Sequence, residues 1–368
     1  MTQFRTSKTW LMRSTALVAM AGLMAVGASV AAVSAATTRS TRPHVVYGTA
    51  TVACAGSLTK LYASALGPAF KRATGDTAGG PPCAGSTALE KEILAHEINP
   101  GVFLSIGAKA IKGLFPAKRA KFAMTVVSNP LVVAYSSHSR YYAQLNAIRA
   151  GKTPLSGLFK LFTTPGFRLG RTDPTQDPQG TFFILMAKLA QRVLHLPAGE
   201  ANKALGITGS SPYGSKSQIV DETALPTDIS TGIFDAGSEF LPEAKQYGLR
   251  YIALPPSLSF GNPKDAALYS TVSLKVSGSV QKGEVIYLDV AFVAPQKGTF
   301  FKRADALANQ AFVAFLLEST GRKILQKVGY ELRPPVLVLA PGYKSAAQVL
   351  PGSILRLFKS LGGKIKTS

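Results

Sequence analysis

The four residues Cys-Ala-Gly-Ser occur twice in this chain, at residues 54–57 and 83–86. The first copy follows a run rich in β-branched residues, and each copy leads directly into a segment with the apolar spacing of a helix. Strands that alternate with helices predict an α/β architecture with largely parallel sheets. Ligands of such sheets bind beyond the carboxyl ends of strands, at helix N-termini. The repeat therefore marks two helix starts as the place to look for a ligand.

The rest of the chain continues the alternation of strands and helices. We expect strands within residues 44–54, 100–107, 122–136, 269–278 and 284–295, and at the start of residues 249–262. We expect helices over residues 55–75, 87–94, 181–194 and 304–329. The segment from Tyr330 onward is basic and interrupted by prolines, and it predicts no regular element.

The N-terminus has the pattern of a Sec-type secretory signal peptide. Residues 15–33 are apolar or small, follow a basic segment and precede Val-Ser-Ala-Ala, so we expect cleavage after Ala35 and domain residues only beyond it. A single membrane anchor is the alternative, which the Ala- and Gly-rich composition disfavours. No clear lipobox is present, because Arg39 and Arg42 interrupt the apolar run before Cys54. We expect an exported protein, periplasmic or extracellular.

Cys54 and Cys83 are the two cysteines of the chain. In an exported protein an isolated pair of cysteines favours a disulfide over two free thiols. Zinc would need further ligands, and the histidines show no spacing that pairs with the cysteines. The histidines are His44, His96, His138 and His195. A disulfide would close a loop over residues 55–82, stabilise the fold by about 3–4 kcal/mol and hold the two turns together.

The chain is strongly basic, with a formal net charge of +22. Removing residues 1–35, which hold Arg5, Lys8 and Arg13 and no acidic residue, leaves a net charge of +19. Such an excess predicts attraction to anions. Nucleic acid is not the expected partner, because the basic residues form no stripe interleaved with aromatics and no nucleic-acid-binding motif is present. A general adaptation of the surface remains the alternative explanation of the charge.

The two Cys-Ala-Gly-Ser turns have the chemistry of an oxyanion cradle. A helix N-terminus carries unpaired N–H groups and a partial positive charge. Gly56 lets the backbone approach a ligand closely, and Ser57 and Ser86 add hydroxyl donors. Two such turns held together would suit a small oxyanion. The alternative is that both serines only cap their own helices.

A third helix start follows "GRTDPTQDPQG", residues 170–180. Asp173 or Asp177 would serve as the cap of this helix. A carboxylate beside a bound anion is electrostatically unfavourable. It becomes reasonable if the carboxyl group is protonated, or if it contacts an electrophilic centre inside the anion.

The order of several segments resembles the molybdate/tungstate-binding proteins of ABC importers, most closely the subgroup typical of archaea. These segments are AGSL, GS, LVVAYS, GRTDPTQDPQG, ETALPTDISTGIFDAGSEF, LRYIALPPSLSFGN and FVAFLLESTGRKILQKVGY. The match covers nearly everything from Tyr47 to Tyr330, and GRTDPTQDPQG is close to the subgroup's G-R-S-D-P-N-x-D-P-C-G.

The resemblance implies a two-lobed periplasmic-binding-protein fold of type II. Two parallel or mixed sheets with helices on both faces would be joined by hinge strands and would close on the anion. We expect residues 43–129 and 288–368 to form domain I and residues 130–287 to form domain II. The implied partners are an ABC permease and its ATPase, the ligand is molybdate or tungstate, and no other cofactor or metal is expected. We expect a monomer.

The resemblance also implies the roles of individual residues. In the archaeal-type subgroup an Asp and a Glu oxygen join the four oxo groups in a six-fold coordination of the metal. By position, Gly56, Ser57 and Ser86 would donate to oxo groups. Further members of the implied site are Asp177 with the backbone of Pro178 and Gln179, Glu222 as the second carboxylate, and Asp173 as the fallback for the first.

Two positions depart from the family pattern. Phe240 stands where the family has a Tyr, so one hydroxyl donor is lost, at a cost of about 1.5–3 kcal/mol for a bond to a charged group. The family's S-A-D is Ser-Ile-Gly at residues 105–107. Either change would weaken binding or shift the selectivity towards another oxyanion.

Other functions remain as alternatives. An enzyme is not expected, because the chain has no G-x-S-x-G elbow, P-loop or H-E-x-x-H motif, and Ser57 and Ser86 have no evident His partner. A phosphate- or sulfate-binding protein is the runner-up; a Glu beside the ligand suits monohydrogen phosphate and is awkward for sulfate. A ligand-free descendant of the fold is the third possibility.

Overall fold

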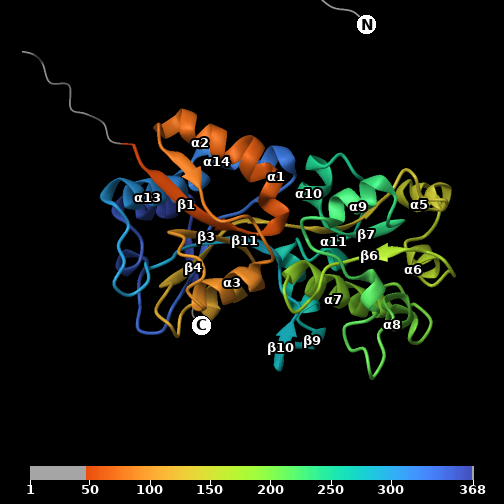
Figure 1. The fold of residues 1–368 in the computed structure, drawn as a ribbon. Coiled ribbons are helices and arrows are strands. Elements are labelled where there is room, and N and C mark those ends of the chain that lie inside the picture. Colours follow the sequence, from red (N-terminus) through yellow and green to blue (C-terminus); the bar gives the residue numbers. More distant parts are fainter. Residues whose placement is uncertain (1–46, 367–368) are drawn as a thin grey trace, which may run out of the picture. The chain divides into compact units, whose positions relative to one another are not determined.

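The computed structural model describes residues 47–366, which form two β-sheets surrounded by helices (Figure 1). These residues belong to one of two units into which the chain divides, residues 46–368. The expected signal peptide, the absent lipobox and the first residues of domain I lie outside the described residues. Within residues 47–366, no helix has the length and apolar character that a membrane span requires.

The first sheet has eight strands in the order β14-β13-β4-β11-β3-β1-β2, with β12 also paired to β4. The strands are β1 (Thr49–Cys54), β2 (Thr77–Gly79), β3 (Val102–Ile106), β4 (Phe122–Ser128), β11 (Tyr287–Phe292), β12 (Glu331–Leu332), β13 (Val336–Leu339) and β14 (Lys364–Lys366). β1 runs parallel to β2 and β3, whereas β11 is antiparallel to both of its neighbours, β3 and β4. The sheet is therefore mixed, and the expectation of largely parallel sheets is wrong for it: β11 returns from the second sheet and enters from the opposite end.

The second sheet has four strands in the order β6-β7-β5-β8. They are β5 (Leu131–Tyr135), β6 (Leu169–Gly170), β7 (Ala236–Phe240) and β8 (Arg250–Ala253). β6 and β7 are parallel, and β5 is antiparallel to β7 and β8. A separate antiparallel pair consists of β9 (Ser273–Val276) and β10 (Ser279–Lys282).

Helices cover both faces of each sheet. Alternate strand residues point to opposite sides, so the apolar residues of one strand pack into the cores on both faces. On β1, Val52 and Cys54 join the apolar cluster that includes Phe312, whereas Ala53 joins a second cluster with Leu89 and Ile93. The second sheet behaves in the same way, since its β5 contributes to two separate clusters. The predicted α/β class, with two sheets and helices on both faces, is confirmed.

The helices have the following bounds. They are α1 (Thr59–Leu61), α2 (Gly67–Thr74), α3 (Ser86–Leu94), α4 (Ala108–Gly113), α5 (Tyr142–Arg149), α6 (Ser156–Phe162), α7 (Pro178–Val193), α8 (Glu200–Leu205), α9 (Leu225–Thr231), α10 (Leu241–Gln246), α11 (Pro256–Ser259), α12 (Ala266–Tyr269), α13 (Arg303–Leu317), α14 (Ser319–Val328) and α15 (Gly352–Ser360).

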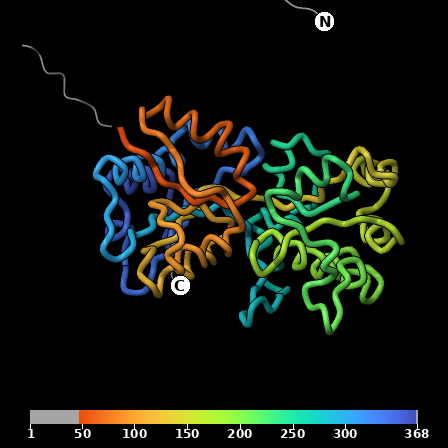
Figure 2. The backbone as a smooth tube through the Cα atoms, viewed as in Figure 1, coloured from red at the N-terminus to blue at the C-terminus, as the bar shows by residue number. Residues whose placement is uncertain are grey.

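The chain passes between the two sheets at adjacent places. It leaves the first sheet after β4, through Asn129 and Pro130, and returns before β11. The Asn129 N–H donates to the Ile286 carbonyl at 2.9 Å, so the outgoing and returning segments lie side by side. In Figure 2 the orange and blue parts of the chain accordingly gather in one half and the yellow-to-cyan part in the other. Domain boundaries at residues 129/130 and 287/288 stay a prediction, which these crossings support.

Two predicted helices are interrupted. The helix expected over residues 55–75 begins as a 3-10 turn at Gly56–Leu58 and contains a π-helical turn at Tyr62–Leu66 between α1 and α2. The helix expected over residues 304–329 is divided into α13 and α14 at Glu318, whose backbone is extended. A Cβ on Gly321 would lie 2.1 Å from the Phe315 carbonyl oxygen, so the two helices meet at a contact that a side chain would prevent.

The C-terminal segment is part of the fold, although the sequence predicts no regular element there. β13 extends the first sheet beyond β4, and β14 extends it beyond β13. Between these strands lies α15, which packs on α13. Ile354 and Phe358 of α15 are buried in the apolar core. Period-3.6 spacing of apolar residues in α15 is the signal that sequence reasoning passed over.

We expect Phe358→Ala to lower the free energy of unfolding by about 3–5 kcal/mol, because it opens a cavity between α15 and α13. Urea denaturation followed by circular dichroism measures this change. Ile365→Ala, at a position 42% exposed on β14, is the matched control and should shift the midpoint little. An unchanged midpoint for Phe358→Ala would mean that α15 contributes nothing to the core.

Candidate functional site

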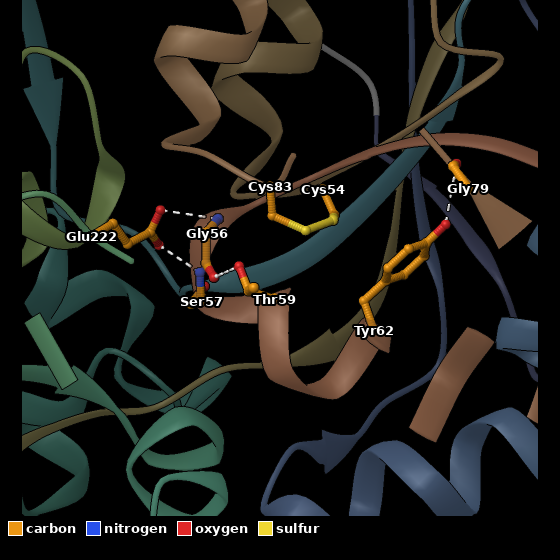
Figure 3. The surroundings of a disulfide bond; sticks show 8 residues. All are labelled: Cys54, Gly56, Ser57, Thr59, Tyr62, Gly79, Cys83 and Glu222. Carbon is orange, nitrogen blue, oxygen red and sulfur yellow. Dashed lines mark hydrogen bonds between the residues drawn. A yellow bond between two sulfur atoms is a disulfide. The ribbon is translucent and has the colours of Figure 1, made fainter. Parts of the chain in front are cut away.

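The two Cys-Ala-Gly-Ser turns lie against each other. Cys54 and Cys83 form a disulfide, as predicted, and the described residues contain no free cysteine (Figure 3). The Ala84 N–H donates to the Cys54 carbonyl at 3.1 Å, and the Gly56 N–H donates to the Ala84 carbonyl at 3.0 Å. The end of β1 and the start of α3 are thus joined by one covalent bond and two backbone hydrogen bonds.

Glu222 bridges the two sheets at these turns. It lies in the loop before α9, on the side of the second sheet. The Ser57 N–H donates to its Oε1 at 3.0 Å, and the Gly56 N–H is shared between its Oε2, also at 3.0 Å, and the Ala84 carbonyl (Figure 3). A Cβ on Gly56 would lie 2.3 Å from Oε2, so this approach requires glycine. The amides that the resemblance assigns to oxo groups are held here by a carboxylate of the chain itself. We call this arrangement the inter-sheet contact.

Neither serine caps its own helix. The N-cap positions are Ala55 and Gly85, and neither makes a side-chain capping bond. The Ser86 hydroxyl instead accepts from the Ile106 N–H at 3.0 Å, which ties the start of α3 to the end of β3. The Ser57 hydroxyl is buried, and its side chain acts on the Glu222 carboxyl group, not on its own helix. The capping alternative is therefore wrong for both serines.

The start of α7 meets the start of α3. Asp177 is the N-cap of α7 and accepts from the Gln179 N–H at 3.1 Å, while its Oδ2 is buried without a partner. The Ala88 N–H donates to the Gln176 carbonyl at 3.2 Å, and a Cβ on Gly85 would lie 3.3 Å from the Cβ of Asp177. The structure thus brings Asp177 beside the second Cys-Ala-Gly-Ser turn.

The other predicted site residues have structural partners. Asp173, the fallback carboxylate, accepts from the Thr175 N–H at 2.8 Å and shapes the loop. Pro178 is the first residue of α7 and has no N–H to offer. The Gln179 N–H is used by Asp177, and its side chain donates to the Ser238 carbonyl at 2.8 Å. Phe240 ends β7 and packs in the apolar core.

Four buried carboxyl groups gather at this place, two of which sequence reasoning missed. They are Asp177, Glu222, Glu239 and Glu243, each at most 4% exposed. Glu239 is on β7 and Glu243 follows in the first turn of α10. The repeated Glu four residues apart in "EFLPEA" was the available signal. Within residues 47–366, no group of three or more His, Cys, Asp or Glu side chains has the geometry to hold a metal ion.

Burial raises the pKa of all four carboxyl groups, because the charged form loses its hydration. The pKa of Asp177 is raised to about 7 by burial, although the Thr172 side chain and the Gln179 amide oppose the shift. The pKa of Glu222 is raised well above its usual value, first by burial and then by the negative charges of Asp177 and Glu243, against the Ser57 amide. Burial likewise raises the pKa of Glu239 to about 8 and that of Glu243 well above its ordinary value.

Arg171 is a further buried group that the sequence did not single out. Its Nε donates to the Gln218 Oε1 at 3.0 Å, and its Nη2 donates to the Tyr213 carbonyl. Burial lowers the pKa of this guanidinium to about 10, and the charge of Asp173 opposes the shift. Arg171 lies between β6 and α7, and its two bonds hold the loop of residues 213–218, which follows α8, against this segment.

The crevice between the sheets is narrow beside these helix starts. A cavity of about 30 Å³ is lined from both sides, by Thr87 and Gly107 and by Pro178 and Thr181 among others. This is the space of about one water molecule.

Comparison with known proteins gives a family. The model of the family described as bacterial extracellular solute-binding protein matches residues 50–331. The match ends where β12 begins, so β13, α15 and β14 lie beyond it.

Individual relatives are distant. A solute-binding protein of Methanococcus maripaludis is 23% identical over 53% of this chain and 62% of its own length. The molybdate/tungstate-binding protein WtpA of Pyrococcus abyssi is 25% identical over 58% of this chain and 62% of its own. The first three relatives are matched over 62%, 60% and 66% of their length, less than two thirds in each case.

Several solved structures align with this chain. One is the periplasmic molybdate-binding protein of Azotobacter vinelandii, which has a TM-score of 0.49 and 16% identity over 77% of this chain and 99% of that one. The sulfate-binding protein SubI of Mycobacterium tuberculosis has a TM-score of 0.46 and 14% identity, over 87% of this chain and 94% of that one. Neither likeness bears on the ligand.

We expect Cys54→Ser with Cys83→Ser to lower the free energy of unfolding by about 3–4 kcal/mol, because the loop over residues 55–82 is no longer closed in the unfolded chain. Urea denaturation of the oxidised protein, the reduced protein and the double variant measures this loss. The reduced protein should match the variant. Three coincident transitions would contradict a stabilising role of the disulfide.

Stability should fall as the pH rises from about 4 to 8. The raised carboxyl pKa values mean that the folded protein holds protons which the unfolded chain, with carboxyl pKa values near 4, has released. Asp235, whose pKa is lowered by contacts with Arg168, contributes the opposite slope only at lower pH. We expect Tm to fall by about 5 °C between pH 5 and 8 in calorimetric scans. A Tm that rises over this interval would contradict the buried acid cluster.

Proposed function

Because the chain belongs to the family of bacterial extracellular solute-binding proteins, we propose that it captures molybdate or tungstate and delivers the anion to an ABC permease and its ATPase. Members of this family are binding proteins of importers, and membership implies export. Export through a signal peptide at residues 1–35, a periplasmic or extracellular location and a monomeric state are parts of the proposal.

The observation that carries the proposal is the inter-sheet contact. The carboxylate of Glu222 is itself an oxyanion, and two backbone N–H groups hold its oxygens at 3.0 Å. The same pair of donors suits the oxo groups of a small dianion, since helix N-termini attract negative charge. The Ser86 hydroxyl accepts from the Ile106 N–H and keeps its own O–H to donate, and the Ser57 side chain already acts on a carboxyl group, so both support the donor roles assigned to them.

The acidic side chains complete the proposed site. Asp177 approaches from the second sheet's helix α7, and Glu222 approaches from the loop before α9. We propose that these two carboxyl groups face the anion, with Asp173 as the reserve for Asp177. The relative from Pyrococcus abyssi, whose name states molybdate and tungstate binding, supports this choice of ligand.

A phosphate- or sulfate-binding protein is the second candidate. A carboxyl group beside the ligand suits monohydrogen phosphate, because in its ionised form it can accept the proton that this ligand carries. Phe240, which has no hydroxyl, is the observation that favours a ligand other than molybdate or a ligand-free descendant.

Calorimetric titration of the mature protein with tungstate, molybdate, sulfate and phosphate tests the function. We expect heat and a rise in Tm with tungstate and molybdate, since a ligand at one hundred times its Kd stabilises by about 2.7 kcal/mol. Glu222→Gln should weaken binding at least about tenfold, the factor that 1.4 kcal/mol corresponds to. The exposed Glu97→Gln is the control and should leave Kd unchanged.

Heat with phosphate alone would replace molybdate by phosphate in the proposal. An unchanged Kd for Glu222→Gln would remove Glu222 from the site.

A further inference from the structure

Two further acids lie behind the proposed anion site. Glu239 is buried on β7, and Glu243 is buried in the first turn of α10. Gln179 connects them to the site: its N–H donates to Asp177, and its side-chain Nε2 donates to the carbonyl of Ser238, the neighbour of Glu239. One residue therefore touches both the N-cap of α7 and β7, the strand that carries Glu239.

The hydrogen bonds of this cluster are short of donors. The buried oxygens without a partner are Glu239 Oε1 and Oε2, Glu243 Oε2, Gln179 Oε1 and Asp177 Oδ2. All five are acceptors when the carboxyl groups are ionised, and a buried acceptor without a donor is unfavourable. A proton turns one carboxyl oxygen into a donor. Protons are therefore what this cluster lacks.

No cation compensates the pair. The ion pairs within residues 47–366 are Arg168–Asp235 and Arg333–Glu331, so neither glutamate has a basic partner. The charges that act on the pair are those of Asp177 and Glu222. The titratable groups that face it from neighbouring elements are Tyr247 and Tyr330.

The nearby basic side chains point elsewhere. On α1, Lys60 lies over the Tyr247 ring, 4.7 Å from its centre. Lys245 of α10 lines a groove together with Arg72 of α2 and Lys327 of α14. On β8, Arg250 lies over the Tyr142 ring. Burial and the charge of Glu239 raise the pKa of Glu243, in agreement with a pair that keeps a proton at neutral pH.

We propose that Glu239 and Glu243 form a proton-binding site behind the oxyanion site, and that the protein takes up a proton there when the dianion binds. The inference rests on the proposed function. A bound dianion adds negative charge near the two glutamates, which favours their neutral forms. The proton passes from buffer to a glutamate oxygen. Because the coupling is reciprocal, protonation of the pair strengthens anion binding, and binding weakens as the pH rises.

Titration calorimetry with sodium tungstate and sodium molybdate between pH 6 and 9 tests this proposal. Each titration is run in two buffers of different ionisation enthalpy, which gives the number of protons taken up. We expect little uptake at pH 6, where the pair is already protonated, and uptake approaching about one proton per anion at pH 8–9. Between pH 8 and pH 9 the affinity should fall by up to about tenfold.

Glu239→Gln with Glu243→Gln keeps the shape of both side chains in permanently neutral form. At pH 8–9 this variant should take up about one proton fewer per anion than the unmodified protein, because only Asp177 and Glu222 of the cluster still titrate, and its affinity should depend less on pH. The matched control is Asp289→Asn, which removes a buried carboxyl group bonded to Thr125 at 2.9 Å in the first sheet and should leave the uptake unchanged. Thermal melting confirms folding, and the two single variants replace the double one if it does not fold.

A second readout needs no ligand. Infrared spectra at pH 6 should show the carbonyl band of protonated carboxyl groups, reduced in the double variant relative to Asp289→Asn. Anion binding with the same number of protons taken up by the unmodified protein and by the double variant overturns the inference and leaves the proposed function intact. If none of tungstate, molybdate, sulfate and phosphate binds at any pH, the proposed function fails, and the linked uptake fails with it.

Discussion

The structure depends on one contact, in which the backbone amides of Gly56 and Ser57 hold the carboxylate of Glu222 across the two sheets. The sheets are also linked near this point by the crossing segments and by the bond from the Ala88 N–H to the Gln176 carbonyl, which joins the starts of α3 and α7. The Glu222 carboxyl group fixes the position of the turn at Gly56–Leu58 relative to the loop before α9, because each of the two N–H groups lies within hydrogen-bond distance of one carboxyl oxygen. The disulfide between Cys54 and Cys83 then places the start of α3 relative to the same amides.

The sequence predicts the elements of this fold well where their pattern is local. The α/β class, the strands on either side of residues 129–130 and the disulfide follow from apolar spacing, β-branched runs and export. Strand direction does not follow, because β11 is antiparallel only by virtue of returning from the other sheet. The break at Glu318 is also invisible locally, since it depends on the contact between Gly321 and the Phe315 carbonyl.

The candidate site is predicted in part for the same reason. Glycine and serine at helix starts indicate hydrogen-bond donors, so Gly56, Ser57 and Ser86 can be identified from the sequence. The acids Asp177 and Glu222 follow from a family resemblance. Sequence reasoning does not reveal that Glu222 is the acceptor of the amides, because the two segments meet only in the folded chain. Glu239 and Glu243 were missed because an acid on a strand or in the first turn of a helix is expected to be exposed, and the burial of β7 and of the start of α10 appears only in the folded chain.

The strand β14 has a consequence for the protein in solution. As the last strand of the first sheet it presents unpaired backbone groups to any extended peptide that approaches. Its sequence is Lys-Ile-Lys, with all three residues exposed. Two ammonium groups of like charge on such a short border repel a second copy of the same strand, so the C-terminal extension protects the sheet against the edge-to-edge association that leads to aggregates.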